Sequence, residues 1–460
     1  MKRAFIITIV FVFSLSVSSI GQSKVLTFQE AVKIALKNGV LLNQQRNNLE
    51  LSQIQKTSSI ASAGPNISMN GSASQFNGNS FNQQAGKVII GIRDNAQGSI
   101  QANMNLFSGF YRINSIRQFA NALDAQTYFV NRTSQDVVST VATQYLQVML
   151  DVELLKIAKE NFEALDKQLQ QVKELVNLGV RSPVEEYNQD ALTKGAELRV
   201  VQAEITLNND KTLLTQTLLI DPFDEYDVEK PNWDINTMGN EVLNAAEMAE
   251  RAKQYRGDYL RALKNEESLK YGAKAAKSIM VPSLIAFGNF GSSYNFAHGQ
   301  PDSVLNGSGV NVRNQAAFNE QFRTNNVYKQ YGLQLTIPLF NGLQNRTTFV
   351  QQRVLYENSQ LNTKNIEYQI KNDVLRAVRT YEGAKKALSI SLTQLKAAEI
   401  AFELETQRYT LGVTNFVDFT NANRALIQAQ TDKAQAEYRF VFQKILIDYS
   451  VGTLKPEDLE

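Results

Sequence analysis

The 460-residue chain has no cysteine, one histidine (His298) and one tryptophan (Trp233). Without cysteine it can form no disulfide framework, no thiolate metal site and no lipid-modified N-terminal cysteine. His298 stands before Pro301 in a loop-like stretch without convergent partners, so we predict a solvent-facing residue. An exported hydrolase is disfavoured, because the chain has no second histidine and no nucleophile motif. A formal net charge of +2 also gives no bulk electrostatic attraction to nucleic acid. We therefore predict no catalytic residue, no metal site, no cofactor and no nucleic-acid partner.

Long hydrophobic runs are also missing after the first 21 residues. A short basic start precedes an apolar run at 4–17, which fits the core of a signal peptide and is short for a membrane anchor. Small residues at Ser19 and Gly21 place the cleavage before Gln22. We therefore predict that 1–21 is a signal peptide and that the mature chain is exported.

The mature chain carries an internal duplication. A Leu-Phe-Ser-Gly string ending at Gly109 recurs as Leu-Phe-Asn-Gly ending at Gly342, and a Leu-Gly-Val string around Gly179 recurs around Gly412. Both offsets are 233, because 342 − 109 = 412 − 179 = 233. The sequence therefore predicts two structural repeats and two flanking segments: first repeat 22–221, inter-repeat equatorial segment 222–242, second repeat 243–452 and C-terminal tail 453–460.

Each repeat is predicted to contain a helix, two strands, a very long helix, a tight turn and a return helix. The first helix opens with a capping box, Thr27 to Glu30, and ends before Pro65; its counterpart ends before Pro282. The long helices lack proline, and at ~1.5 Å per residue each would reach roughly 100 Å. The predicted long helices are 110–177 and 343–410, and the predicted return helices are 184–220 and 417–450.

Between each proline and the following Leu-Phe string, hydrophobicity alternates with a period of two, as at Tyr331, Leu333 and Leu335. A strand with lipid on one side and water on the other needs this pattern. Taken alone, however, the alternation favours a strand of a soluble sandwich, because the barrel signal per segment is weak. The predicted strands are about 66–76, 97–107, 283–295 and 328–340. The segments 77–95 and 297–326 are rich in Asn, Gln, Gly and Ser, and we predict exposed loops there.

The number of strands predicts an oligomer. Four strands cannot close a barrel, and an open edge cannot lie in lipid because its backbone groups would find no partners. Three subunits would supply twelve strands. The predicted fold is therefore mixed and mainly α: a duplicated helix–strand–strand–long helix–helix unit, with a trimeric 12-stranded outer-membrane β-barrel on a long α-helical barrel.

This order of elements resembles the TolC family of outer-membrane efflux proteins. Further matches are the opening Leu-Thr-Phe-Gln-Glu-Ala-Val at 26–32, the paired Leu-Phe-Xaa-Gly strings, the glycine turns and the closing Val-Gly-Thr-Leu at 451–454. The resemblance implies a homotrimeric channel of a tripartite efflux pump or type I secretion system. It implies contact with outer-membrane lipid, a large periplasmic portion, and docking to a periplasmic adaptor served by an inner-membrane pump. The alternative is a structural periplasmic coiled-coil or adaptor-type protein, which would leave the duplicated alternating strands unexplained.

The resemblance also implies functional positions around the two glycine turns. In the family these turns form the periplasmic mouth and the surface that docks the adaptor. Two family aspartates three residues apart line the entrance constriction; Asp418 matches the first and Asn421 stands at the second, while Thr414 stands where members carry an arginine. Glu185 corresponds to Asp418 by the same offset, and either carboxylate also fits stabilisation of a helix N-terminus. The predicted docking residues are Leu178, Gly179, Val180, Leu411, Gly412 and Val413.

Overall fold

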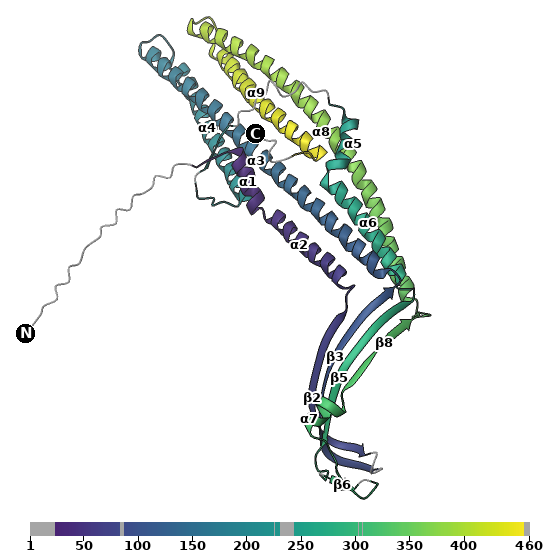
Figure 1. Cartoon of the computed structure of the whole chain (residues 1–460). Coiled ribbons are helices and arrows are strands. Elements are labelled where there is room, and N and C mark those ends of the chain that lie inside the picture. The colour runs from purple at the N-terminus through teal and green to yellow at the C-terminus, as the bar shows by residue number, and fades with distance from the viewer. Residues whose placement is uncertain are drawn as a thin grey trace, which may run out of the picture. The chain divides into compact units, whose positions relative to one another are not determined.

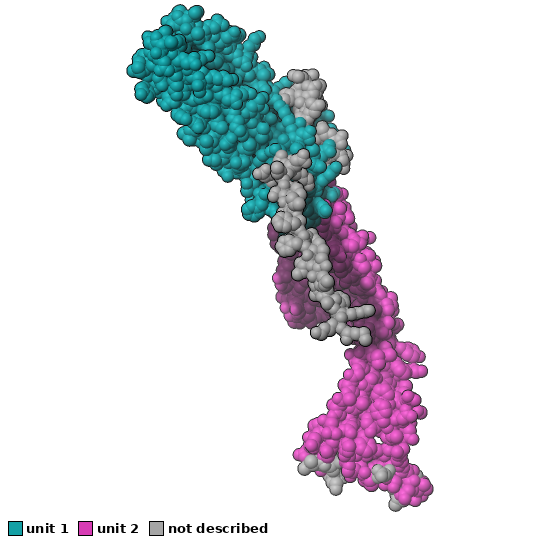
Figure 2. Space-filling view, turned by 90° about the vertical axis from the view of Figure 1, so that its left-hand side faces the viewer, with its two compact units in different colours: residues 1–44, 131–256, 369–460 teal, residues 45–130, 257–368 magenta. Residues whose placement is uncertain are grey.

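The computed structural model describes residues 24–82, 87–224, 226–230, 243–301, 303–305 and 307–454. The predicted signal peptide, Trp233 and the tail after 454 lie outside these residues. The chain divides into two compact units (Figure 2). Unit 1 comprises 1–44, 131–256 and 369–460, and unit 2 comprises 45–130 and 257–368.

The longer helices of the structure fall into two sets, one for each repeat (Figure 1). Those of the first repeat are α1 (Phe28–Asn38), α2 (Val40–Ala61), α3 (Tyr111–Asn177) and α4 (Pro183–Leu218). Those of the second are α5 (Ala245–Tyr255), α6 (Gly257–Ser278), α8 (Gln344–Thr410) and α9 (Phe416–Val451). The α5 and α6 helices start 217 residues after α1 and α2 (245 − 28 = 257 − 40), and α8 and α9 start 233 after α3 and α4 (344 − 111 = 416 − 183). Of the described helices, none is long and apolar enough to cross a membrane.

The single first helix expected in each repeat is broken in two. The Thr27 capping box forms as predicted, with the Glu30 amide donating to Thr27 Oγ1 at 3.2 Å. At Gly39, however, ψ is 114° and α1 stops; a Cβ there would lie 2.7 Å from the Ala35 carbonyl oxygen. Arg256 breaks the second repeat at the equivalent position with ψ 115°. Neither break contains a proline. The hydrophobic periodicity of the sequence continues through both breaks, so it predicts one uninterrupted helix in each repeat.

Tyr145 on α3 holds the equatorial part of unit 1 together. Its hydroxyl lies 2.8 Å from the Leu26 carbonyl oxygen and 2.7 Å from that of Glu229. These carbonyls flank a two-stranded parallel sheet, β1 (Lys24–Leu26) with β4 (Tyr226–Val228). The Tyr145 ring is fully buried and makes an edge contact with Phe28, 5.3 Å between centroids. One side chain thus anchors α1, α3 and the inter-repeat segment to a common core.

A four-stranded antiparallel sheet forms the strand part of unit 2, in the order β2-β3-β5-β8 (Figure 1). Its strands are β2 (Asn66–Asn82), β3 (Lys87–Ser108), β5 (Ser283–Ala297) and β8 (Tyr328–Thr336). The prediction of a loop at 77–95 is wrong, because β2 and β3 stay paired from Asn66↔Asn103 to Asn82↔Lys87. Backbone hydrogen bonds form this ladder whatever the side chains are, so a polar composition did not exclude it. The last strand stops at Thr336, before Pro338, which has no amide to donate.

The segment after β5 is also more ordered than the loop predicted for 297–326. Two short strands pair, β6 (Ser303–Leu305) and β7 (Asn311–Arg313), followed by α7 (Phe318–Glu320) and a π-helix η1 (Gln321–Asn325). Side-chain amides extend the edge of β5 where β8 has not yet begun. Gln315 bonds the amide and carbonyl of Ala297, Gln321 bonds those of Asn295, and Asn326 donates to the Ser293 carbonyl. Glutamine and asparagine amides mimic a peptide group, so they replace a neighbouring strand.

The two faces of the sheet differ in chemistry. One face carries apolar side chains that are largely exposed in the single chain, including Met69 (80%), Tyr331 (87%) and Leu333 (65%). The opposite face carries Asn and Gln side chains, such as those of Gln101 and Asn289, which are paired across β3 and β5. Among the described strands, β2 and β8 each have one unpaired edge. The sheet thus has two open edges and an apolar face that the described residues of its own chain cover only around Gly98, where Phe322 of η1 packs.

Candidate functional site at the helical tips

Two short turns connect the long helices of unit 1 to their return helices. In each turn a glycine adopts φ +72°, a region that only glycine enters without cost, at Gly179 and at Gly412. The Val180 amide closes the first turn on the Leu175 carbonyl at 2.8 Å, and the Val413 amide closes the second on that of Arg408 at 2.9 Å. The flanking apolar side chains point outward: Leu178 is 75% exposed, Val180 69%, Leu411 78% and Val413 65%.

Arg181 ties the two hairpin tips together. Its guanidinium donates to Glu185 Oε2 at 2.6 Å and to the Tyr409 carbonyl oxygen at 3.0 Å. It also lies over the Tyr409 ring, 4.6 Å from the centroid. The hydrogen bond with Glu185 raises the pKa of Arg181, and burial raises the pKa of the Tyr409 phenol. Tyr409 lies in the last turn of α8, and Arg181 lies in the turn just before α4. The contact between them therefore joins the first hairpin to the second.

Glu185 and Asp418 occupy equivalent positions in the two repeats, yet their surroundings differ. Glu185 is neutralised by Arg181. Asp418 is exposed and forms no ion pair among the described residues; its Oδ2 accepts from the Thr414 hydroxyl at 3.2 Å, and its amide donates to the Asn415 cap at 2.9 Å. Asn421 lies exposed one turn further along α9. Of these two equivalent acids, only Asp418 therefore offers an uncompensated carboxylate.

Sequence reasoning missed the role of Arg181, although the signal was present. Arg181 corresponds to Thr414 by the repeat offset, since 414 − 181 = 233. An arginine missing from the second turn is thus present in the first. His298 is exposed in a turn, as predicted, but it has a partner that the sequence did not show: its Nε2 lies 2.7 Å from Asp94 Oδ2, and Asp94 accepts a second bond from Gln75. Asp94 lies on β3, in the segment that the sequence assigned to a loop.

A buried carboxyl beside a half-exposed one in unit 1 was not foreseen either. Asp151 on α3 is 3% exposed, its Oδ2 has no hydrogen-bond partner among the described residues, and the carboxyl of Asp210 on α4 lies near enough to act on its pKa. Its Oδ1 also accepts from Gln147 Nε2 at 3.0 Å. Burial, followed by the contact with Asp210, raises the pKa of Asp151 to about 7. Burial and a neighbouring carboxylate both favour the protonated form of a carboxyl group.

Comparison with known proteins identifies relatives with this architecture. A family model described as outer membrane efflux protein matches residues 248–446. The outer membrane protein TolC of Vibrio cholerae is 22% identical over 333 residues, 71% of this chain and 70% of that protein. TolC of Escherichia coli K12 is 22% identical over 386 residues, 80% of this chain and 72% of that protein. The structure of the Vibrio cholerae outer membrane protein VceC superposes with a TM-score of 0.77 at 13% identity, covering 92% of this chain and 96% of that one.

The duplicated long helices, the four-stranded sheet with an apolar face, and the paired tips define a subunit of an outer-membrane channel. Over residues 248–446 the chain matches the outer membrane efflux protein family, and over most of its length it is similar to TolC proteins. This is a family of channels with an outer-membrane portion and a periplasmic portion, and not a family of enzymes.

Proposed function

We propose that three copies of the chain form a passive outer-membrane channel for small molecules or exported substrates. It receives them from an inner-membrane pump through a periplasmic adaptor and releases them outside. The system served is a tripartite efflux pump or a type I secretion system. The observation that carries this proposal is the sheet of unit 2, whose apolar face is largely exposed and whose two edges are unpaired.

The two free edges fit one another in a ring. The β8 strand of one copy would pair with β2 of the next, so that no backbone group is left unpaired in lipid. Three copies give twelve strands, a barrel wide enough for a water-filled interior. The exposed side chains of Met69, Tyr331 and Leu333 would then face lipid, and the amide-rich face would line the water path. Outer-membrane barrels show this division of faces.

The tips fit the role of the adaptor-docking surface. Leu178, Val180, Leu411 and Val413 expose apolar side chains at the ends of both hairpins, where folding of the single chain gains nothing from them. Grouped apolar residues on an otherwise polar surface mark sites of protein association. The turns around Gly179 and Gly412 therefore suit an apolar contact with the helical ends of a partner.

We place the entrance constriction at Asp418 and Asn421, and we propose a structural role for Glu185. Three unpaired Asp418 carboxylates around one axis would favour cations and bind multivalent ones. Because Arg181 already neutralises Glu185, the equivalent acid would add little negative field. Glu185 instead holds the arginine that joins the two hairpins, so it would help to keep the entrance closed.

The mass of the detergent-solubilised outer-membrane particle tests the proposal, measured by native mass spectrometry. A particle of three chains supports the closed barrel. A stable monomer would contradict the proposed channel, because a four-stranded sheet with open edges cannot remain in lipid.

A further inference from the structure

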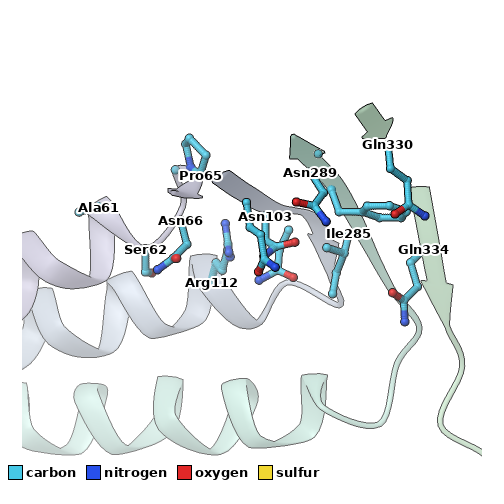
Figure 3. A pocket seen from close by; sticks show the side chains of 15 residues that line it. Ala61, Ser62, Pro65, Asn66, Asn103, Arg112, Ile285, Asn289, Gln330 and Gln334 are labelled. Atoms are coloured by element: carbon cyan, nitrogen blue, oxygen red, sulfur yellow. The ribbon is translucent and has the colours of Figure 1, made fainter. Parts of the chain in front are cut away.

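At the foot of the sheet, where β2 begins and β3 ends, unit 2 contains an open hollow of about 640 Å³ in which amide side chains are the most frequent polar groups (Figure 3). Seven of its 15 lining residues are asparagine or glutamine, among them Asn66 on β2, Asn103 on β3, Asn289 on β5 and Gln334 on β8. No aspartate or glutamate contributes to the lining. The wall can therefore donate and accept hydrogen bonds, but it cannot neutralise a positive charge.

Arg112 is the only charged residue that lines this hollow. It projects from the first turn of α3 and lies between Asn66 and Asn103 (Figure 3). Its side chain is half-buried, and within the described residues no carboxylate and no hydrogen-bond acceptor is recorded for its guanidinium. A guanidinium carries five donors, and a half-buried one without a partner is costly unless water or a ligand satisfies it.

The strand register shows that the surrounding face is free of acids. Positions in register with Gln101 and Asn103 carry amide, hydroxyl, glycine or apolar side chains on β2, β5 and β8. Arg93 lies on this same face further along β3. Asp94 belongs to the opposite face, where it pairs with His298. The field over this face is therefore positive near Arg112, because the four strands place no carboxylate on this face.

The second repeat has no such charge, which makes Arg112 a particular feature of the first. The equivalent position is Asn345, since 345 − 112 = 233. In the hollow itself, Phe287 packs over Gly332, where a Cβ would lie 2.9 Å from the ring. This apolar contact forms part of the wall and leaves the amides and Arg112 as its polar groups.

We infer that the hollow around Arg112 is a subsite for an anionic oxygen group, a carboxylate or phosphate, on solutes that pass the foot of the barrel. The inference rests on the proposed channel, in which this face lines the water path. The guanidinium would bind two oxygens of such a group side by side, a geometry that suits arginine. The amides of Asn66, Asn103 and Asn289 would hold the remaining oxygens without repelling the charge.

Ion selectivity of the reconstituted trimer in planar bilayers tests this inference. We expect Arg112→Gln to lower the chloride-to-potassium permeability ratio on the order of two-fold, the effect of removing one charge at ~6 Å in screened water. Arg112→Lys should keep most of the ratio. The control is Arg323→Gln, which removes the same charge from η1, a segment whose Phe322 lies against Gly98 on the opposite face of the sheet.

Block by citrate and by inorganic phosphate separates the carboxylate source from the phosphate source. A several-fold loss of block by either probe in Arg112→Gln, and not in Arg323→Gln, supports the subsite and names its preferred group. A conducting Arg112→Gln trimer with unchanged selectivity and unchanged block by both probes would overturn the inference while leaving the channel intact. Absence of any conductance in the wild-type trimer would instead remove the proposed function, and the inference with it.

Discussion

Replacement of Asp151 by asparagine should remove a pH dependence that is built into the first helical hairpin. The Asp151 carboxyl is 3% exposed, accepts from Gln147 through Oδ1, and lies beside the carboxyl of Asp210. Its pKa rises from an ordinary 3.8 to about 7, chiefly because burial penalises the charged form. Between these two values the folded protein holds a proton that the unfolded chain releases.

The sign of the effect follows from proton linkage. Because the folded state binds more protons, the stability contributed by this group is complete below about pH 4 and is lost as pH rises through 7. The difference of about 3 pKa units corresponds to about 4 kcal/mol per subunit at most, at roughly 1.4 kcal/mol per unit. Asp210 is half-exposed, so water would reduce this to on the order of 2 kcal/mol.

In Asp151→Asn the side chain cannot ionise, and its amide can donate to an ionised Asp210. We expect the variant and the wild type to be equally stable at pH 4, and the variant to be more stable by about 2 kcal/mol at pH 8. Hydrogen exchange of peptides from α3 and α4, corrected for the intrinsic rate, measures this locally. Protection around Asp151 should fall about 30-fold between pH 4 and pH 8 in the wild type and stay nearly constant in the variant.

Glu163→Gln is the matched control, because it removes an exposed carboxylate from the same helix. It should leave the wild-type pH profile in place. If Asp151→Asn showed the same loss of protection as the wild type, the proton on the buried Asp151 carboxyl would not exist and the reasoning would be refuted.

Three further predictions concern the tips. Asp418→Ala should reduce the cation preference of the channel and relieve its block by multivalent cations in bilayer recordings; unchanged block would exclude an acidic ring. Arg181→Gln and Glu185→Gln should each weaken the tie between the hairpins by about 1 kcal/mol, seen as higher mean conductance, and the double variant should add nothing. Leu411→Ser and Leu178→Ser should weaken capture of a purified adaptor without changing the mass of the trimer, since both side chains are exposed in the single chain.

Features set by local geometry could be predicted from the sequence. The capping box at Thr27 forms because a hydroxyl and a carboxylate three residues apart satisfy the first amides of a helix. The glycines of the two tips adopt the left-handed conformation that ends a helix. Helix ends and turns depend on a few neighbouring residues, so their signals are readable without knowledge of the fold.

Features set by distant partners could not be predicted. Many strand positions between 77 and 95 are polar, such as Asn77, Asn79 and Asn95, and these lie in strands because each finds a backbone partner across the hairpin. Gln315 and Gln321 look like loop residues until the edge of β5 is placed beside them. Asp151 and Asp210 are 59 positions apart (210 − 151), and no spacing rule brings them together before α4 folds back on α3.

The duplication itself explains why the two tips should do different work. Both repeats keep the backbone, since the glycine conformation is the same at Gly179 and Gly412. Their charges have diverged, because Thr414 occupies in the second turn the position that Arg181 occupies in the first, 233 residues earlier. Where the arginine is present, it occupies the neighbouring acid and reaches across to the other hairpin; where it is absent, Asp418 keeps its charge. One fold copied twice thereby gives each subunit a structural tie at its first tip and an uncompensated carboxylate at its second.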